Sequence, residues 1–65
     1  MNLTINGQIE KFEVETLTIL ELLKLKNIEK KVVVELNREI IKSQNFDFNL
    51  KHGDQLEILY FMGGG

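Results

Sequence analysis

The apolar residues of this chain recur with the two-residue period of β-strands in most segments, and with helical spacing in only one. The period, together with β-branched composition, predicts strands at 1–5, 8–14, 32–36, 40–41 and 55–61. The dipeptide Asn6-Gly7 lies between the first two and readily forms a tight hairpin turn. We therefore expect these two strands to be antiparallel, with Phe12 and Val14 facing the core.

The single helical stretch begins with a capping box, in which Thr18 and Glu21 each satisfy a free backbone N–H at the helix start. The apolar positions that follow share one face, namely Ile19, Leu22 and Leu23, and the pattern ends near Asn27. One helix can cover one face of one sheet. The sequence thus predicts an α+β fold of the β-grasp (ubiquitin-like) type, with one main helix and a mixed four- or five-stranded sheet. We expect this domain over 1–62, followed by a flexible glycine tail at 63–65.

The composition excludes most catalytic mechanisms that depend on cysteine, on several histidines or on a bound metal. The chain has no Cys and one His, so the sequence predicts no disulfide, no thiol nucleophile and no metal site. His52 lies in a predicted turn without a triad arrangement beside it, and we interpret it as a surface residue rather than a catalytic base. Phe46 and Phe48 could form a ligand platform, but in so small a domain the favoured interpretation is that they plug the edge of the core. We do not expect an enzyme.

The net charge and the hydropathy of the chain argue against two classes of partner, nucleic acids and membranes. The formal net charge is -2, whereas nucleic-acid-binding domains carry a concentrated basic face. Four lysines do cluster around the predicted helix end, at Lys24, Lys26, Lys30 and Lys31, but Glu21 and Glu29 lie among them. We interpret the cluster as a solvated helix end rather than an RNA site. No apolar run approaches the ~20 residues of a membrane span, so we expect no membrane and no nucleic-acid partner, and a cytoplasmic location.

The chain ends in Gly63-Gly64-Gly65, directly after the last predicted strand. A frayed end or a linker is the ordinary interpretation of such a tail, but numbering from Met1 to Gly65 favours a native end. Glycine lacks a Cβ, so the tail can pass through a channel too narrow for side chains and deliver its carboxylate into another protein. A carboxylate must first be activated, most simply by ATP. Because this chain has no phosphate-binding loop, a separate enzyme must do so.

The chain resembles the ubiquitin-like sulfur carriers, and the ThiS branch in particular, in several features and in the order in which they occur. These features are the Asn6-Gly7 turn, the Thr18-x-x-Glu21 helix start, Leu36-Asn37-Arg38-Glu39, His52-Gly53-Asp54 and terminal Gly64-Gly65. The resemblance implies that a ThiF-like enzyme uses ATP to adenylate the Gly65 carboxylate and that a sulfur donor protein converts it to a thiocarboxylate. It further implies sulfur delivery to a ThiG-like thiazole synthase in thiamin biosynthesis, with no cofactor bound to the carrier. One departure is Gly63, where family tails often have a small or aliphatic residue.

A carrier also needs a surface on which its partners dock. The outward positions of the last strand are Leu59 and Phe61, and we expect Val33 and Ile9 to share that face of the sheet. Neighbouring acids, Glu35 and Glu57, would steer a basic partner surface.

Other functions remain open at the level of sequence. The small subunit of molybdopterin synthase shares the fold and the Gly-Gly end but passes its sulfur to a pterin, although it usually is longer. A ubiquitin-like modifier or a pure interaction module belongs to a different class, in which the tail forms an isopeptide bond or has no chemistry.

Overall fold

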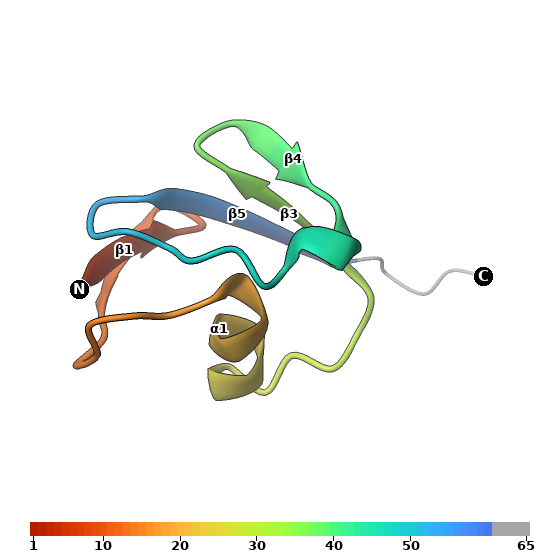
Figure 1. Ribbon diagram of the computed structural model, residues 1–65. Coiled ribbons are helices and arrows are strands. Elements are labelled where there is room, and N and C mark those ends of the chain that lie inside the picture. The colour runs from red at the N-terminus through yellow and green to blue at the C-terminus, as the bar shows by residue number, and fades with distance from the viewer. Residues whose placement is uncertain (61–65) are drawn as a thin grey trace.

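The computed structural model describes residues 1–60, which form one five-stranded sheet with a helix packed on one face (Figure 1). In chain order the elements are β1 (Asn2–Ile5), β2 (Gln8–Lys11), α1 (Ile19–Leu25), β3 (Val32–Leu36), β4 (Glu39–Ile41), the 3-10 helix η1 (Ser43–Asn45) and β5 (Gln55–Tyr60). The strand order is β2-β1-β5-β3-β4, in which β1 and β5 are parallel and the other neighbours are antiparallel. This mixed sheet confirms the predicted α+β, β-grasp arrangement. The predicted boundary at 62, the tail 63–65 and the extension of the last strand to Phe61 lie outside the described residues.

Both hairpins turn through residues with positive φ. Asn6 has φ 50° and Gly7 has φ 84°, as the tight turn predicted for this dipeptide requires. The β3–β4 hairpin repeats the arrangement with Asn37 at φ 50° and Arg38 at φ 74°. Left-handed backbone costs a residue with a side chain about 1–2 kcal/mol, and Asn is among the residues that adopt it most readily.

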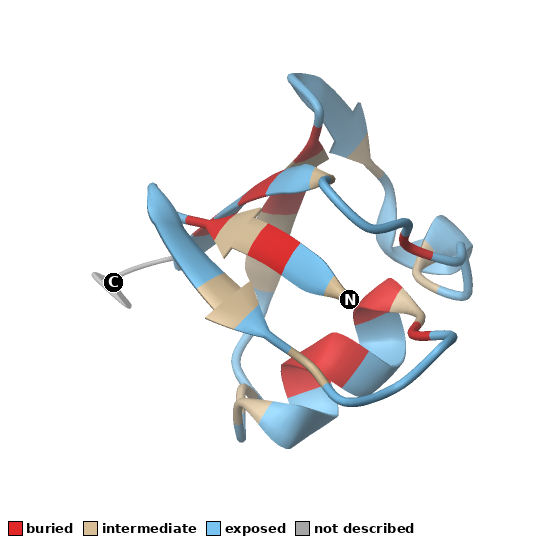
Figure 2. Cartoon of the chain, turned by 90° about the vertical axis from the view of Figure 1, so that its left-hand side faces the viewer, coloured by how far each residue is buried: buried red, intermediate tan, exposed pale blue. Residues whose placement is uncertain are grey.

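The core lies between the inner face of the sheet and α1 (Figure 2). Its buried residues are Leu3, Ile5, Leu17, Ile19, Leu22, Leu23, Val34, Leu36, Leu50, Leu56 and Ile58. The predicted alternation is therefore confirmed in the three central strands, and the predicted apolar face of the helix is confirmed in full. Tyr60 has the phase of the inner face but is largely exposed, because it lies past the last core residue of β5.

The start of α1 is held by its own capping box and by the chain between β4 and β5. The Thr18 N–H donates to Glu21 Oε1 at 2.9 Å, and the Glu21 N–H donates to Thr18 Oγ1 at 3.1 Å. The Ile19 N–H donates to the Phe48 carbonyl at 3.2 Å, and the Leu20 N–H donates to the Phe46 carbonyl at 2.9 Å. The polar stretch before β5 thus satisfies helix donors that would otherwise lack partners. Phe46 packs against the core as predicted, whereas the prediction is wrong for Phe48, whose side chain is exposed.

The second strand is shorter than predicted. β2 ends at Lys11, and Val14 is 42% exposed rather than turned toward the core. The cause is the length of its partner strand. Asn2 pairs with Lys11, and Met1, the first residue of the chain, exchanges two backbone hydrogen bonds with Phe12. Residues 13 and 14 have no strand beside them, so the alternating pattern there has nothing to pair with. Phe12 is half-buried against the core, as expected.

Candidate functional site

The strand that leads to the predicted modification site is central in the sheet. β5 pairs with β1 on one side and with β3 on the other, and its last described residue, Tyr60, pairs with Val32. Gly63, Gly64 and Gly65 follow beyond the described residues. The described part of β5 therefore ends at a residue that is paired in the sheet.

Two turn asparagines bind the backbone of β5. The Asn6 Nδ2 group donates to the Ile58 carbonyl at 3.3 Å, and the Ile58 N–H donates to Asn6 Oδ1 at 2.7 Å. At the start of the strand, the Gln55 N–H donates to Asn37 Oδ1 at 3.0 Å, while Asn37 Nδ2 donates to Asp54 Oδ1 at 3.0 Å. The sequence predicts the turn at Asn6, but it does not predict the contacts of either asparagine with β5. The available signal was an Asn at the first turn position of each hairpin, where its amide can reach a neighbouring backbone.

The outer face of the sheet carries an apolar pair beside the end of β5. Val33 lies directly opposite Leu59 in the β3–β5 ladder, and Leu59 is 49% exposed. Ile40 of β4 lies opposite Glu35, on the same face and 67% exposed. We call Val33, Leu59 and Ile40 the outer patch; these side chains lie on the face of the sheet that α1 leaves uncovered. Phe61, also predicted for this surface, lies outside the described residues.

Ile9 does not join the outer patch, although it is 75% exposed on the same face. It lies on the edge strand β2 opposite Thr4, which in turn pairs with Gln55. Leu59 is four residues further along β5, about 13 Å at a strand rise of about 3.3 Å per residue. The structure thus brings together Val33 and Leu59 and leaves Ile9 apart.

The centre of the outer face is acidic. Glu35 and Glu57 lie directly opposite one another on β3 and β5. Like charges in this position destabilise a sheet. Arg38 lines the same shallow hollow as the two glutamates, so one cation lies beside two acids. A partner that brought a cationic side chain to this position would relieve the repulsion.

His52 and Lys26 have structural contacts. The Asn2 N–H donates to His52 Nδ1 at 2.9 Å, which ties the exposed turn before β5 to the start of β1. Lys26 Nζ donates to both carboxylate oxygens of Glu10, at 2.8 and 2.9 Å, and joins the end of α1 to β2. Lys26 is therefore half-buried in an ion pair between α1 and β2, rather than a free cation at the helix end.

Two properties of residues 1–60 bear on metal binding and on membrane insertion. No group of three or more His, Asp or Glu side chains there is arranged to hold a metal ion. The one α-helix of this part is too short to cross a membrane.

The chain is similar to proteins of one family over its whole length. The ThiS family model matches residues 3–65. The sulfur carrier protein ThiS of Bacillus subtilis (strain 168) is 40% identical in an alignment 65 residues long, which covers 97% of this chain and 98% of that protein. The crystal structure of the thiamine biosynthesis protein ThiS from Geobacter metallireducens matches with a TM-score of 0.87 at 43% identity, and the match covers 100% of both chains.

Proposed function

The chain belongs to the ThiS family of sulfur carrier proteins, and from this premise we propose that the Gly65 carboxylate is the group that carries the sulfur. The protein is a carrier in thiamin biosynthesis and not an enzyme itself. The observation that carries the proposal is the family match, which extends through residue 65 and therefore includes the glycine tail.

The proposed chemistry has two steps at the end of the chain. A carboxylate oxygen of Gly65 attacks the α-phosphorus of ATP, which gives an acyl-adenylate and releases pyrophosphate. A hydrosulfide ion delivered by the sulfur donor then attacks the acyl carbon, the C–O bond to AMP breaks and AMP leaves with its electrons, and loss of the S–H proton leaves a thiocarboxylate. The sulfur stays nucleophilic but tethered, so that a high local concentration replaces diffusion of free sulfide.

This chemistry requires partner enzymes. We propose a ThiF-like adenylating enzyme that consumes the ATP, a sulfur donor protein, and a ThiG-like thiazole synthase that accepts the sulfur, all in the cytoplasm. The carrier itself binds no cofactor in this scheme. Membership in the ThiS family favours the thiazole acceptor over the pterin acceptor of molybdopterin synthase.

The arrangement of β5 supports delivery of the tail. β1 pairs with the start of β5, the Asn6 amide binds Ile58, and β3 pairs with the strand as far as Tyr60, so the last described residue before the tail is held in the sheet. Residues 63–65 have no side chains that would block a narrow channel. We propose that Val33 and Leu59, together with Phe61, contact the partner while the glycines enter its active site.

Intact mass spectrometry tests this function. The protein would be co-expressed with the candidate adenylating enzyme and a sulfur source, and fragmentation would locate any mass gain from replacement of one oxygen by sulfur. The expected result is a gain on Gly65, which fragmentation distinguishes from oxidation of Met1 or Met62. An unmodified Gly65 in the presence of demonstrably active partners would contradict the proposal and favour a pure interaction module.

A further inference from the structure

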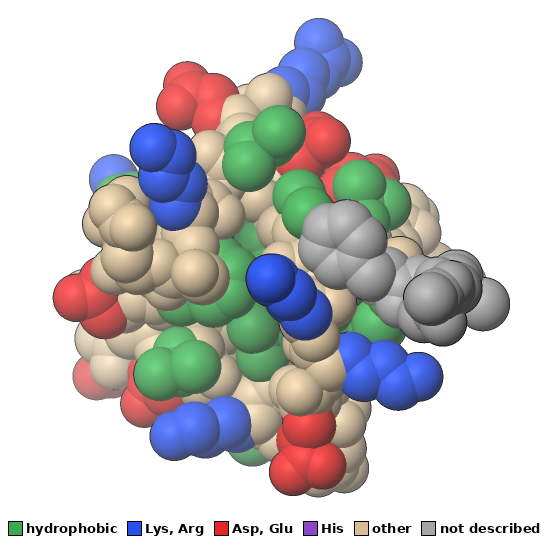
Figure 3. Space-filling view, turned by 90° about the vertical axis from the view of Figure 1, so that its right-hand side faces the viewer, with side chains coloured by type: hydrophobic (Ala, Val, Ile, Leu, Met, Phe, Trp, Pro, Cys, Tyr) green, Lys and Arg blue, Asp and Glu red, His purple; other side chains and the backbone are tan. Residues whose placement is uncertain are grey.

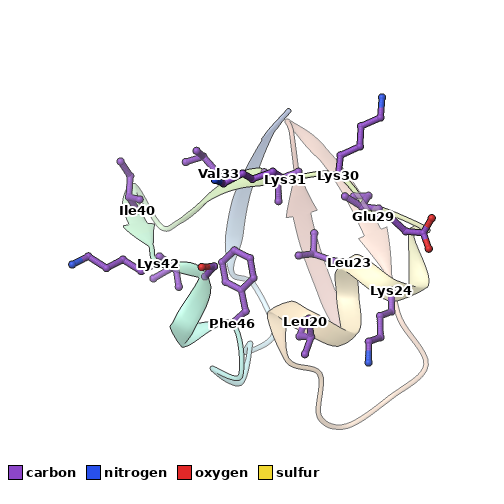
Figure 4. A pocket seen from close by; sticks show the side chains of 14 residues that line it. Leu20, Leu23, Lys24, Glu29, Lys30, Lys31, Val33, Ile40, Lys42 and Phe46 are labelled. Atoms are coloured by element: carbon purple, nitrogen blue, oxygen red, sulfur yellow. The ribbon is translucent and has the colours of Figure 1, made fainter. Parts of the chain in front are cut away.

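A groove of about 630 Å³ opens at the edge of the sheet, between α1, the start of β3 and the segment from β4 to η1 (Figure 4). Its apolar lining includes Leu23 and Phe46, which belong to the core or pack against it. Leu20 of α1 also lines the groove and is 46% exposed. Figure 4 shows Leu20, Leu23 and Phe46 on the side formed by α1 and η1, facing the strand that carries Val33.

The rim of this groove is basic, although the protein as a whole is acidic. Four lysines line it, namely Lys24, Lys30, Lys31 and Lys42, against the single acid Glu29. The formal net charge of the whole chain is -2. Within residues 1–60 the ion pairs are Lys11–Glu13 and Lys26–Glu10, so none of the four rim lysines has a carboxylate of that part within bonding distance. Figure 3 shows lysine side chains standing around an apolar hollow on this side of the molecule.

The groove lies next to the end of β5. Val32 lines it and also pairs with Tyr60, the last described residue of that strand. Val33 and Ile40 belong both to the groove and to the outer patch, so the two surfaces adjoin at the sheet edge. A molecule in the groove would therefore lie beside the segment from which the tail continues.

We propose that this groove binds an acidic segment of a partner protein that projects one large apolar side chain. The apolar side chain would contact Leu20 and Phe46, while flanking carboxylates would lie near Lys31 and Lys42. The argument is charge complementarity around an apolar floor: an apolar anchor benefits from the exposed lining, and acids benefit from lysines that lack carboxylate partners. The proposal concerns binding alone, goes beyond the outer patch, and does not depend on the chemistry of Gly65.

The lining favours this occupant over two others. A phosphate or a nucleic-acid backbone would use the lysines but leave Leu20 and Phe46 exposed. A purely apolar ligand would use the floor but would gain nothing from four cations around it. Only a ligand that is both acidic and apolar uses the lysine rim as well as the apolar floor of the groove.

Backbone-amide NMR titration of the isotope-labelled full chain tests the proposal. The probe is an end-blocked hexapeptide Asp-Glu-Ser-Phe-Glu-Asp with one large apolar side chain, and two control peptides replace either its acids by lysine or its Ser-Phe by Ser-Gly. We expect saturable shifts of the groove amides with the first peptide, and at least fivefold weaker binding of either control. Equal binding of the Ser-Gly peptide or of inorganic tripolyphosphate would overturn the proposal in favour of a general anion surface. Absence of saturable shifts, or shifts that depend on protein concentration alone and so report a second copy, would also overturn it.

Matched variants locate the binding. Lys31→Glu should weaken binding of the acidic peptide at least fivefold. Lys51→Glu makes the same charge change at an exposed residue before β5 that does not line the groove, and it should alter binding less than twofold. Leu20→Ser should weaken binding similarly, and Leu25→Ser is its control, because Leu25 is exposed on the same helix but does not line the groove. Equal effects of a variant and its control would overturn the assignment to this groove.

Discussion

The side-chain amide of Asn6 continues the backbone hydrogen bonding between β1 and β5. The Asn6 N–H donates to the Leu56 carbonyl at 2.9 Å, and its side chain then exchanges two hydrogen bonds with the backbone of Ile58. One turn residue therefore supports β5 beyond the last residue of β1. The supported stretch leads directly to Leu59, so the turn of the first hairpin positions both the outer patch and the end of the strand.

Replacement of Asn6 should separate its role in the turn, where it adopts a positive φ, from the role of its side-chain hydrogen bonds to Ile58. Asn6→Gly keeps the positive φ but removes both side-chain bonds, and we expect a loss of about 1–3 kcal/mol in the free energy of unfolding at about 0.5–1.5 kcal/mol per bond. Asn6→Ala should lose about 1 kcal/mol more, because alanine is strained at this φ. Urea unfolding measures both losses, and hydrogen exchange should show weaker protection of the Ile58 amide.

Asn27→Gly is the control for these variants. Asn27 also has a positive φ, at 56°, but its side chain forms no hydrogen bond within residues 1–60. Glycine is favoured at such a position after a helix, so stability should change by less than about 0.5 kcal/mol or rise. A similar loss for Asn27→Gly and Asn6→Gly would show that the amide contacts to Ile58 contribute nothing.

Deletion of Gly65 should abolish adenylation and leave the fold intact. The described strand pairing ends at Tyr60, so removal of the last residue takes no described contact from the domain. The remaining carboxylate on Gly64 would end one residue short of the adenylating site. ATP–pyrophosphate exchange by the partner enzyme measures the loss, and the urea midpoint should not move.

Gly63→Ala provides the comparison, since it adds one methyl group but keeps the length and the terminal Gly64-Gly65 pair. We expect it to retain exchange activity, because family tails often have a small residue at this place. Full exchange activity after deletion of Gly65 would refute the assignment of the modified carboxylate.

Leu59→Ser should weaken binding of the adenylating enzyme. Leu59 is exposed in the outer patch, so its loss should lower the free energy of unfolding by no more than about 1 kcal/mol. If it anchors the partner, the dissociation constant should rise at least tenfold, which corresponds to about 1.4 kcal/mol. Isothermal titration calorimetry with the partner measures this change.

Ile9→Ser is the matched control for Leu59→Ser. It makes a similar change on the same face of the sheet, at a residue that the structure places away from the outer patch. Its effect on the dissociation constant should stay below twofold. A larger effect of Ile9→Ser than of Leu59→Ser would move the contact surface to the β1–β2 side of the sheet.

Features that depend on neighbouring residues in the chain were predictable from the sequence. The Asn6-Gly7 turn and the Thr18–Glu21 capping box follow from local backbone chemistry, and both are present in the structure. The alternation that buries Leu56 and Ile58 is equally local. From these parts the fold class could be assembled, because one helix and several strands permit few arrangements.

Features that depend on the length or position of a distant partner were not predictable. Val14 continues an alternating pattern, but β1 is too short to pair with it. The contact of Asn6 with Ile58 requires the parallel pairing of β1 with β5, which no local pattern reports. The same reason applies to the predicted lysine cluster, which the fold separates into two groups. Lys26 pairs with Glu10 of β2. The other three, Lys24, Lys30 and Lys31, line the groove together with Lys42.

Replacement of Leu22 and replacement of Leu20, both on α1, should differ sharply in their effect on stability. Leu22 is 0% exposed in the core, whereas Leu20 lies at the groove. Leu22→Ala should lower the free energy of unfolding by about 2–5 kcal/mol, because it removes apolar contacts and leaves a cavity. A domain of this size has a total of about 3–10 kcal/mol, at about 0.05–0.15 kcal/mol per residue, so this variant should lose a large share of its stability and unfold at a markedly lower urea concentration. Leu20→Ala should cost less than about 1 kcal/mol, and urea unfolding followed by circular dichroism measures both. Equal losses would mean that Leu20 is buried in solution, and the groove beside α1 would then be closed to any peptide.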